Sequence, residues 1–161
     1  WVPYVGAMFG AWFGGLLAQN RIKAGWSVNR TRKVVIGLGC LIMLPSLLAM
    51  SNPGSPSTAV IIMAVILFGF QTSIGNVQTL PSDMFGGKTI ATLAGYSGTA
   101  AKLGAVALTS LVPWLTSGGN YAPAFVIGAA LAVIAMLSVL ILIPRIKPLK
   151  KDKHNLEFKQ S

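Results

Sequence analysis

Long apolar stretches, separated by short polar segments, follow one another along most of this chain. A membrane hydrocarbon core about 30 Å thick requires about 20 helical residues to cross it, with a range of about 17 to 25. Membrane barrel strands alternate between apolar and polar positions, and these stretches do not. The pattern therefore predicts an all-α integral membrane protein with five transmembrane helices, at about residues 2–19, 34–50, 58–80, 91–115 and 122–143.

The connecting segments are polar or rich in turn-forming residues, and they comprise residues 20–33, 51–56, 81–89 and 116–120. Short connections make neighbouring helices antiparallel, and a chain in lipid must satisfy its backbone hydrogen bonds internally. We therefore expect one partial transmembrane bundle over residues 1–144, followed by a basic tail over residues 145–161.

Composition and charge agree with a membrane location. The 161 residues are 53% hydrophobic and 10% charged, which leaves too few polar side chains to cover a water-soluble domain. The connections carry five, none, one and no Lys or Arg in chain order, and the tail carries six. Positive charge marks the cytoplasmic side, so we expect a multi-pass protein of the inner or plasma membrane with residue 1 outside and the tail cytoplasmic. Nucleic-acid binding is not favoured, because no nucleic-acid-binding module accompanies the charge.

The chain starts at Trp1, inside an apolar stretch, without a charged leader or a small-residue cleavage site. We therefore expect further transmembrane helices upstream in the complete protein.

Lys102 is a lysine near the middle of the fourth apolar stretch, roughly 16 to 20 Å from either end at about 1.5 Å per residue. An intramembrane Lys costs at least about 2.5 to 3.5 kcal/mol, so a functional role is the first hypothesis. The acids of the chain, Asp83, Asp152 and Glu157, all lie outside that depth. The favoured partner is a transported anion; an acid on a missing helix and a neutral or hydrated Lys are the alternatives.

Amide side chains gather at the end of the third stretch. Gln71 and Gln78 share one helical face, and Asn76 points about 140° away from Gln71. One side is expected to line a polar pathway, where amides suit sugar hydroxyls because they both donate and accept. Hydrogen bonding to a neighbouring helix is equally favoured.

Small residues at helical spacing occur twice. Gly10 and Gly14 form a GxxxG pair, and Gly95 and Gly98 share a face with Lys102. Helix packing is the commoner role of such residues, and room for a ligand beside the Lys is the other.

Enzyme motifs are absent from the sequence, and the single Cys40 and single His154 lie on different segments. We therefore expect no catalytic activity, no metal site and no cofactor.

Three blocks of sequence, in order along the chain, carry a resemblance to a known family. They are Gly14–Gly15 with Lys23–Lys33, then Gln71–Asn76 with Thr79–Phe85, then Ala91–Ala101. These blocks resemble the segment between helices eight and nine, the tenth helix with its Ser-Asp-x-Phe exit, and the glycine-rich eleventh helix of major facilitator transporters. The closest likeness is to the anion:cation symporter family, particularly its hexuronate and sugar-acid members.

The resemblance implies that the five stretches are helices 8 to 12 of a twelve-helix carrier. Such carriers work by alternating access and take up organic anions together with a cation, usually H⁺. The expected partners are therefore an organic anion, a coupling cation, the lipid bilayer and the missing amino-terminal transmembrane half. The alternative is a membrane-embedded structural or accessory subunit without transport activity.

The resemblance also assigns roles to individual residues. It implies that Gln71 and Asn76 contact the substrate. We expect Lys102 to be a third substrate contact, but only because of its depth in the membrane and not because of the resemblance. It implies a cytoplasmic charge network that stabilises the closed inner gate, although anchoring of the topology explains these charges equally well. The network consists of Arg30, Arg32, Lys33 and Asp83. Related sugar-acid carriers often have His at the position of Phe70 and an acid at the position of Met8. This chain therefore departs from the family pattern at two positions that bear on hexuronate specificity and on proton coupling.

Overall fold

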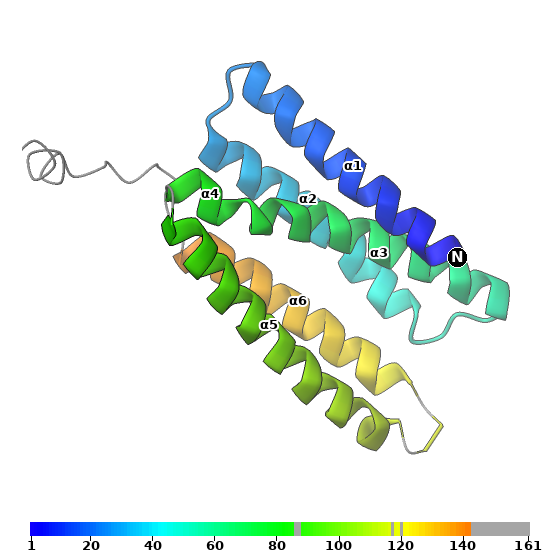
Figure 1. The fold of residues 1–161 in the computed structure, drawn as a ribbon. Coiled ribbons are helices and arrows are strands. Elements are labelled where there is room, and N and C mark those ends of the chain that lie inside the picture. The colour runs from blue at the N-terminus through cyan, green and yellow to red at the C-terminus, as the bar shows by residue number, and fades with distance from the viewer. Residues whose placement is uncertain (86–87, 117, 120, 143–161) are drawn as a thin grey trace, which may run out of the picture.

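The computed structural model describes residues 1–85, 88–116, 118–119 and 121–142, and in this part of the chain all regular elements are helices (Figure 1). They are α1 (Val2–Lys23), α2 (Val28–Ala49), α3 (Pro56–Gln78), α4 (Leu80–Met84), α5 (Lys88–Leu115) and α6 (Ala122–Leu142). The predicted all-helical class is confirmed for these residues. The basic tail predicted for residues 145–161 lies outside the described residues.

The basic connection predicted for residues 20–33 is mostly helical. The helix α1 continues to Lys23, and α2 begins at Val28. Lys and Arg are good helix formers, so a helix can extend beyond the apolar residues that lie in the membrane core. The turn between them uses Gly25 at φ +88°, followed by Ser27, whose hydroxyl accepts a hydrogen bond from the Arg30 backbone amide at 3.3 Å. The connection predicted for residues 81–89 likewise contains the short helix α4.

Three segments of the described chain are long and apolar enough to cross a membrane, namely Val28–Ala49, Pro56–Met84 and Ala122–Val139. The helices α1 and α5 are long enough but fall outside this set. The helix α1 contains four Gly residues, one Trp and one Tyr, and α5 contains three Gly, two Ser and four Thr residues. The chain is thus an integral membrane protein, and the span count of five stays a prediction.

The helix α3 is the centre of the packed part of the structure. Both α1 and α2 pack along it, α6 packs on α2, and α5 makes few contacts, mainly with α4 and α6. Most of the buried side chains of the described residues accordingly lie on α1, α2 and α3, and they include Ala18, Val35, Ile36 and Thr72. This three-helix seam holds the polar residues of interest.

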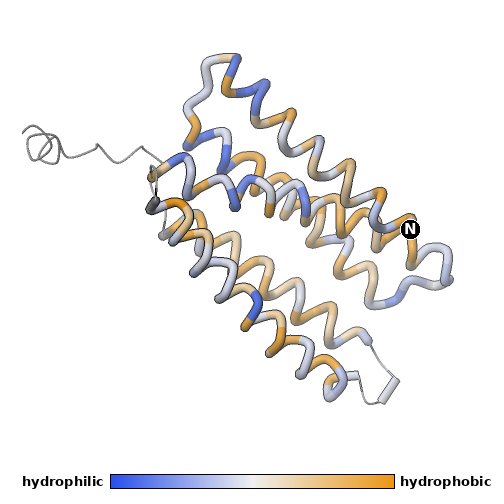
Figure 2. The backbone as a smooth tube through the Cα atoms, in the orientation of Figure 1, coloured by the Kyte–Doolittle hydropathy of each residue, from blue (hydrophilic) through white to orange (hydrophobic). Residues whose placement is uncertain are grey.

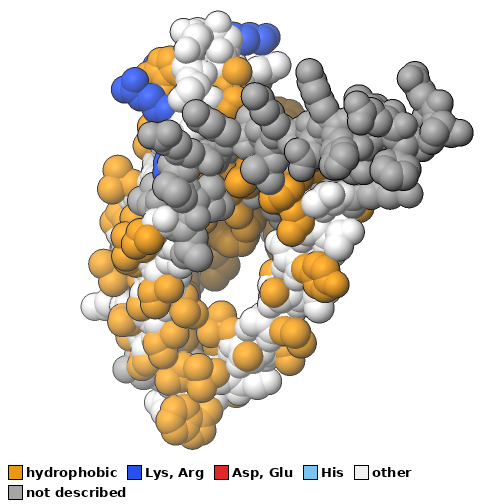
Figure 3. All heavy atoms as spheres, turned by 90° about the vertical axis from the view of Figure 1, so that its left-hand side faces the viewer, with side chains coloured by type: hydrophobic (Ala, Val, Ile, Leu, Met, Phe, Trp, Pro, Cys, Tyr) orange, Lys and Arg blue, Asp and Glu red, His pale blue; other side chains and the backbone are white. Residues whose placement is uncertain are grey.

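Polar residues collect at one end of the bundle, where α1 is followed by α2 and α3 by α4 (Figure 2). Elsewhere large apolar side chains face outward, such as Trp12 (62% exposed), Leu103 (67%) and Ile141 (71%). Figure 3 shows hydrophobic side chains spread over the visible face, with Lys and Arg gathered at the same polar end. Lipid tails or further helices cover such a surface in a membrane.

Candidate functional site

The seam between α1 and α3 depends on glycines. Gly10 and Gly14 are buried, and a Cβ atom on Gly14 would come within 2.9 Å of the Thr72 carbonyl oxygen. A Cβ atom on Gly10 would overlap the carbonyl of Phe68, and one on Gly6 would overlap that of Ala64. The glycine pair expected to pack helices therefore lies at the closest approach of two helices, and Gly6, which the motif did not include, extends it.

Two side chains of α3 cross this seam to the carbonyls of these glycines. The Thr72 hydroxyl donates to the Gly10 carbonyl at 3.0 Å, and the Asn76 amide donates to the Gly14 carbonyl at 3.4 Å and to the Thr72 carbonyl at 3.0 Å. Both side chains are buried, at 0% and 3% exposure. Close backbone approach thus brings each glycine carbonyl within reach of a polar side chain on α3.

The seam between α2 and α3 repeats this arrangement. A Cβ atom on Gly69 would lie 2.6 Å from the Gly39 carbonyl oxygen. The Ser73 hydroxyl donates to the Ile36 carbonyl at 3.0 Å and lies 3.6 Å from the Cys40 sulfur. Sequence analysis missed this seam, although Gly69, Ser73 and Asn76 follow the three-and-four spacing of one helical face and could have indicated it.

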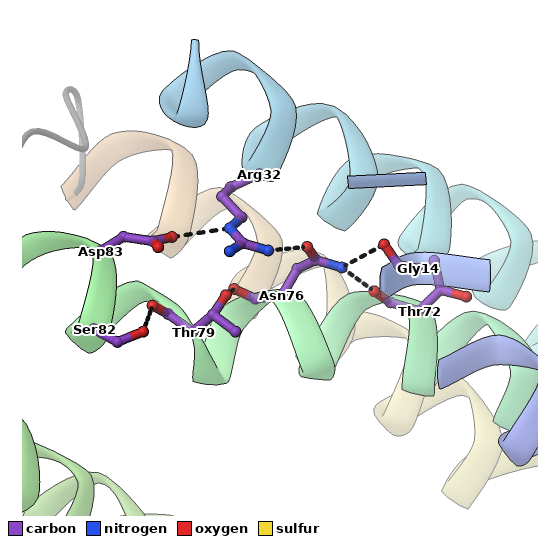
Figure 4. A network of polar contacts seen from close by, with 7 residues as sticks. All are labelled: Gly14, Arg32, Thr72, Asn76, Thr79, Ser82 and Asp83. Atoms are coloured by element: carbon purple, nitrogen blue, oxygen red, sulfur yellow. Dashed lines mark hydrogen bonds and ion pairs between the residues drawn. The ribbon is translucent and has the colours of Figure 1, made fainter. Parts of the chain in front are cut away.

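A charged cluster stands at the polar end of the three-helix seam (Figure 4). The Arg32 Nε atom donates to Asp83 Oδ2 at 2.9 Å, and its Nη1 atom donates to Asn76 Oδ1 at 2.8 Å. The Arg32 and Asp83 side chains are 15% and 20% exposed. The helix end that carries Asp83 is held by the Thr79 hydroxyl, which donates to the Asn76 carbonyl at 2.8 Å.

Asn76 on α3 therefore connects to three other helices. Its amide bonds directly to Gly14 of α1 and to Arg32 of α2, and Arg32 in turn bonds to Asp83 of α4. This is the interhelical hydrogen bonding that stood beside substrate contact as an alternative. Direct contact between Asn76 and a substrate stays a prediction, and its carbonyl oxygen and amide nitrogen both have protein partners here.

The four residues of the expected charge network are not all brought together. Arg32 and Asp83 pair directly, whereas the exposed Arg30 guanidinium lies over the Trp26 ring, 4.4 Å from its centroid. The Arg21 guanidinium also lies 4.9 Å from that ring centroid. Lys33 follows Arg32 on α2 and is partly exposed.

The other predicted substrate residues lie apart from this cluster. Gln71 is partly exposed on α3, and Lys102 is exposed on α5. A Cβ atom on Gly95 or Gly98 would meet no atom within 4 Å in the described residues, so these glycines pack against nothing there. The face of α5 around Lys102 is therefore open to a ligand, to lipid or to another helix.

The cavities beside the helix seams of the described residues include two that adjoin polar residues of interest. One, of about 440 Å³, lies between α2, α3 and α6 and has an almost wholly apolar lining that includes Cys40, Ser73 and Met136. The second, of about 510 Å³, lies between the end of α1 and the start of α2. It is lined by Gly15, Ala18, Gln19, Ile22, Lys23 and Arg32.

Comparison with known proteins places the chain beside bacterial carriers. No family model matches it. A hexuronate transporter of Escherichia coli K12 is 30% identical over 145 residues, which is 88% of this chain and 32% of the transporter. A D-galactonate transporter of Escherichia coli O6:H1 is 27% identical over 147 residues, or 91% of this chain and 34% of that protein. The chain thus spans about a third of the length of these relatives. Both relatives are named as transporters and neither as an enzyme. The resemblance to major facilitator carriers of sugar acids is thereby confirmed. This chain is a homologue of such transporters over about a third of their length.

Proposed function

We propose that the chain is part of a secondary transporter that moves an organic anion, specifically a sugar acid such as a hexuronate, together with H⁺. The observation that carries the proposal is the similarity of nearly the whole chain to a hexuronate transporter and a D-galactonate transporter. In this proposal the five long helices are helices 8 to 12 of a carrier whose other helices complete the transport path.

Lys102 is the proposed anchor for the substrate carboxylate. It is the sole charged side chain between residues 89 and 144, and it lies on an exposed helical face beside glycines that leave room next to it. A negative partner stabilises a lysine at membrane depth, and a carboxylate supplies one. Gln71, which is partly exposed on α3, is the proposed contact for sugar hydroxyls.

The Arg32–Asp83 pair is the proposed inner gate latch. It ties the start of α2 to α4, the short helix that links α3 to α5. A charge pair that is only 15% and 20% exposed interacts more strongly than one fully in water, yet it can still open to solvent. That balance suits a contact that must form and break in each cycle of alternating access.

The second candidate is a structural subunit whose polar residues serve only helix contacts. The hydrogen bonds of Thr72, Ser73 and Asn76 across helix seams support it, because each has a packing role that needs no substrate.

Uptake separates the two candidates. The complete protein that contains this chain is expressed in bacterial cells that lack their own sugar-acid uptake, and labelled D-glucuronate is supplied with and without a protonophore. The carrier proposal expects saturable uptake that the protonophore abolishes. A protein that reaches the membrane intact but gives no uptake of D-glucuronate or D-galactonate contradicts it.

A further inference from the structure

The open cavity of about 510 Å³ between α1 and α2 has a lining suited to a negative ligand. Its polar side chains are Gln19, Lys23 and Arg32, and Gly15, Ala18 and Ile22 supply its apolar wall. Two of the six lining residues are cations and none is an acid. The volume falls within the range of ordinary small-molecule sites, about 300 to 1,000 Å³.

Arg32 is the part of this lining that is already held in place. Asp83 and Asn76 each accept one hydrogen bond from it, which fixes the guanidinium between α2, α3 and α4. A guanidinium has five N–H donors in a rigid plane, so these two contacts leave donors for a further acceptor. Lys23, at the end of α1, is exposed and can turn its flexible ammonium group toward the same ligand.

The sequence supplies little negative charge to compete for these cations. Asp83 is the one acid in residues 1–151, and its carboxylate oxygen is 2.9 Å from Arg32 Nε. Residues 20–33 contain five Lys and Arg and no acid. The region therefore has an excess of positive potential that a small anion can neutralise.

We propose that this cavity is a binding site for the carboxylate group of a small anion, held between Lys23 and Arg32, and that the bound anion competes with Asp83 for Arg32. The site is separate from the proposed anchor at Lys102 and does not depend on it. The anion uses donors that Asp83 and Asn76 leave free, but two negative groups beside one guanidinium repel each other. Anion binding therefore weakens the latch, and the latch weakens anion binding to the same degree.

Two variants of the complete protein, purified in detergent, test the site. Both remove one positive charge from the end of α1: Lys23→Gln alters the cavity lining, whereas Arg21→Gln alters a cation that stacks on Trp26 instead. D-glucuronate and, separately, inorganic phosphate are titrated by calorimetry in a Lys102→Gln background, which removes the proposed substrate anchor. Lys23→Gln is expected to weaken D-glucuronate binding about ten-fold, the effect of losing one charge-assisted contact, and Arg21→Gln less than about two-fold.

The competition with Asp83 has its own readout. Asp83→Asn frees Arg32 and is expected to tighten D-glucuronate binding several-fold, whereas a merely diffuse attraction between the protein and anions gains little from it. Equal weakening by Lys23→Gln and Arg21→Gln, or no saturable binding at all, overturns the site. Binding of phosphate but not of D-glucuronate overturns the carboxylate assignment. Failure of cellular uptake with this binding intact would refute the transport proposal alone.

Discussion

Replacing Asn76 by alanine removes the amide that links α1, α2 and α3. The amide accepts a charge-assisted hydrogen bond from Arg32 at 2.8 Å, a kind worth about 1.5 to 3 kcal/mol. It also donates to the Thr72 carbonyl of its own helix at 3.0 Å and, across the seam, to the Gly14 carbonyl of α1 at 3.4 Å. An interhelical hydrogen bond in a membrane protein is worth about 0.6 kcal/mol on average. We therefore expect Asn76→Ala to lower the free energy of unfolding by about 2 to 3 kcal/mol.

The assay is reversible unfolding of the complete protein in mixed micelles, followed by helical circular dichroism as denaturing detergent is added. Gln78→Ala is the matched control, because it removes an exposed amide from the same helix, and its expected effect is within about 0.5 kcal/mol. A double-mutant cycle between Asn76→Ala and Arg32→Gln should give a coupling free energy of about 1 kcal/mol or more.

One result would refute this reasoning. If Asn76→Ala leaves the unfolding free energy unchanged but sharply weakens substrate binding, the residue is a substrate contact and its hydrogen bonds to α1 and α2 contribute nothing measurable. Lower stability with an unchanged affinity for D-glucuronate supports the interhelical role instead.

Three further predictions concern the seam, the latch and the anchor. Gly10→Val should lower the free energy of unfolding by about 2 kcal/mol or more, because the new Cβ atom would overlap the Phe68 carbonyl. Gly15→Val is the control: it has open space around it and should leave the free energy of unfolding nearly unchanged in the same assay. Asp83→Asn should cost about 1 to 2 kcal/mol, between the values for exposed and fully buried pairs, and an unchanged unfolding midpoint would count against the latch. Lys102→Gln should abolish D-glucuronate uptake by cells while Lys102→Arg retains part of it; equal uptake by both variants and the wild type would exclude the anchor.

Sequence reasoning located the helices because apolar length is a local property. It placed their ends less well at the first connection, where Lys23 belongs to α1 and only a short turn precedes Val28. Hydrophobicity indicates which residues lie in the membrane core, but it does not indicate where a helix ends. Here the left-handed conformation of Gly25 follows the end of α1, and the Ser27 cap marks the start of α2.

Glycine spacing predicted packing without saying against what. Gly10 and Gly14 meet the α3 backbone, but Gly95 and Gly98, of similar spacing, meet no atom in the described residues. The difference depends on which helix lies opposite, and residues far apart in the sequence decide that.

The charged cluster was predicted only in part. Arg32 and Asp83 were expected in one network through the family resemblance, and they pair at 2.9 Å. The link through Asn76 was not predicted, because helical geometry gives the direction of a side chain and not the neighbour it meets. Arg30 was expected in the network, but its guanidinium lies over the Trp26 ring, 4.4 Å from the ring centroid, where a cation is attracted by the face of the ring.

Counterflow in liposomes is the most direct measurement of anion transport by this protein. The complete protein is reconstituted into vesicles loaded with unlabelled D-glucuronate and diluted into a trace of labelled D-glucuronate, so that exchange needs no ion gradient. We expect rapid, saturable accumulation of label that external D-galactonate inhibits and neutral D-glucose does not. Inhibition by D-glucose as strong as that by D-galactonate, or no exchange by correctly folded protein, would contradict it.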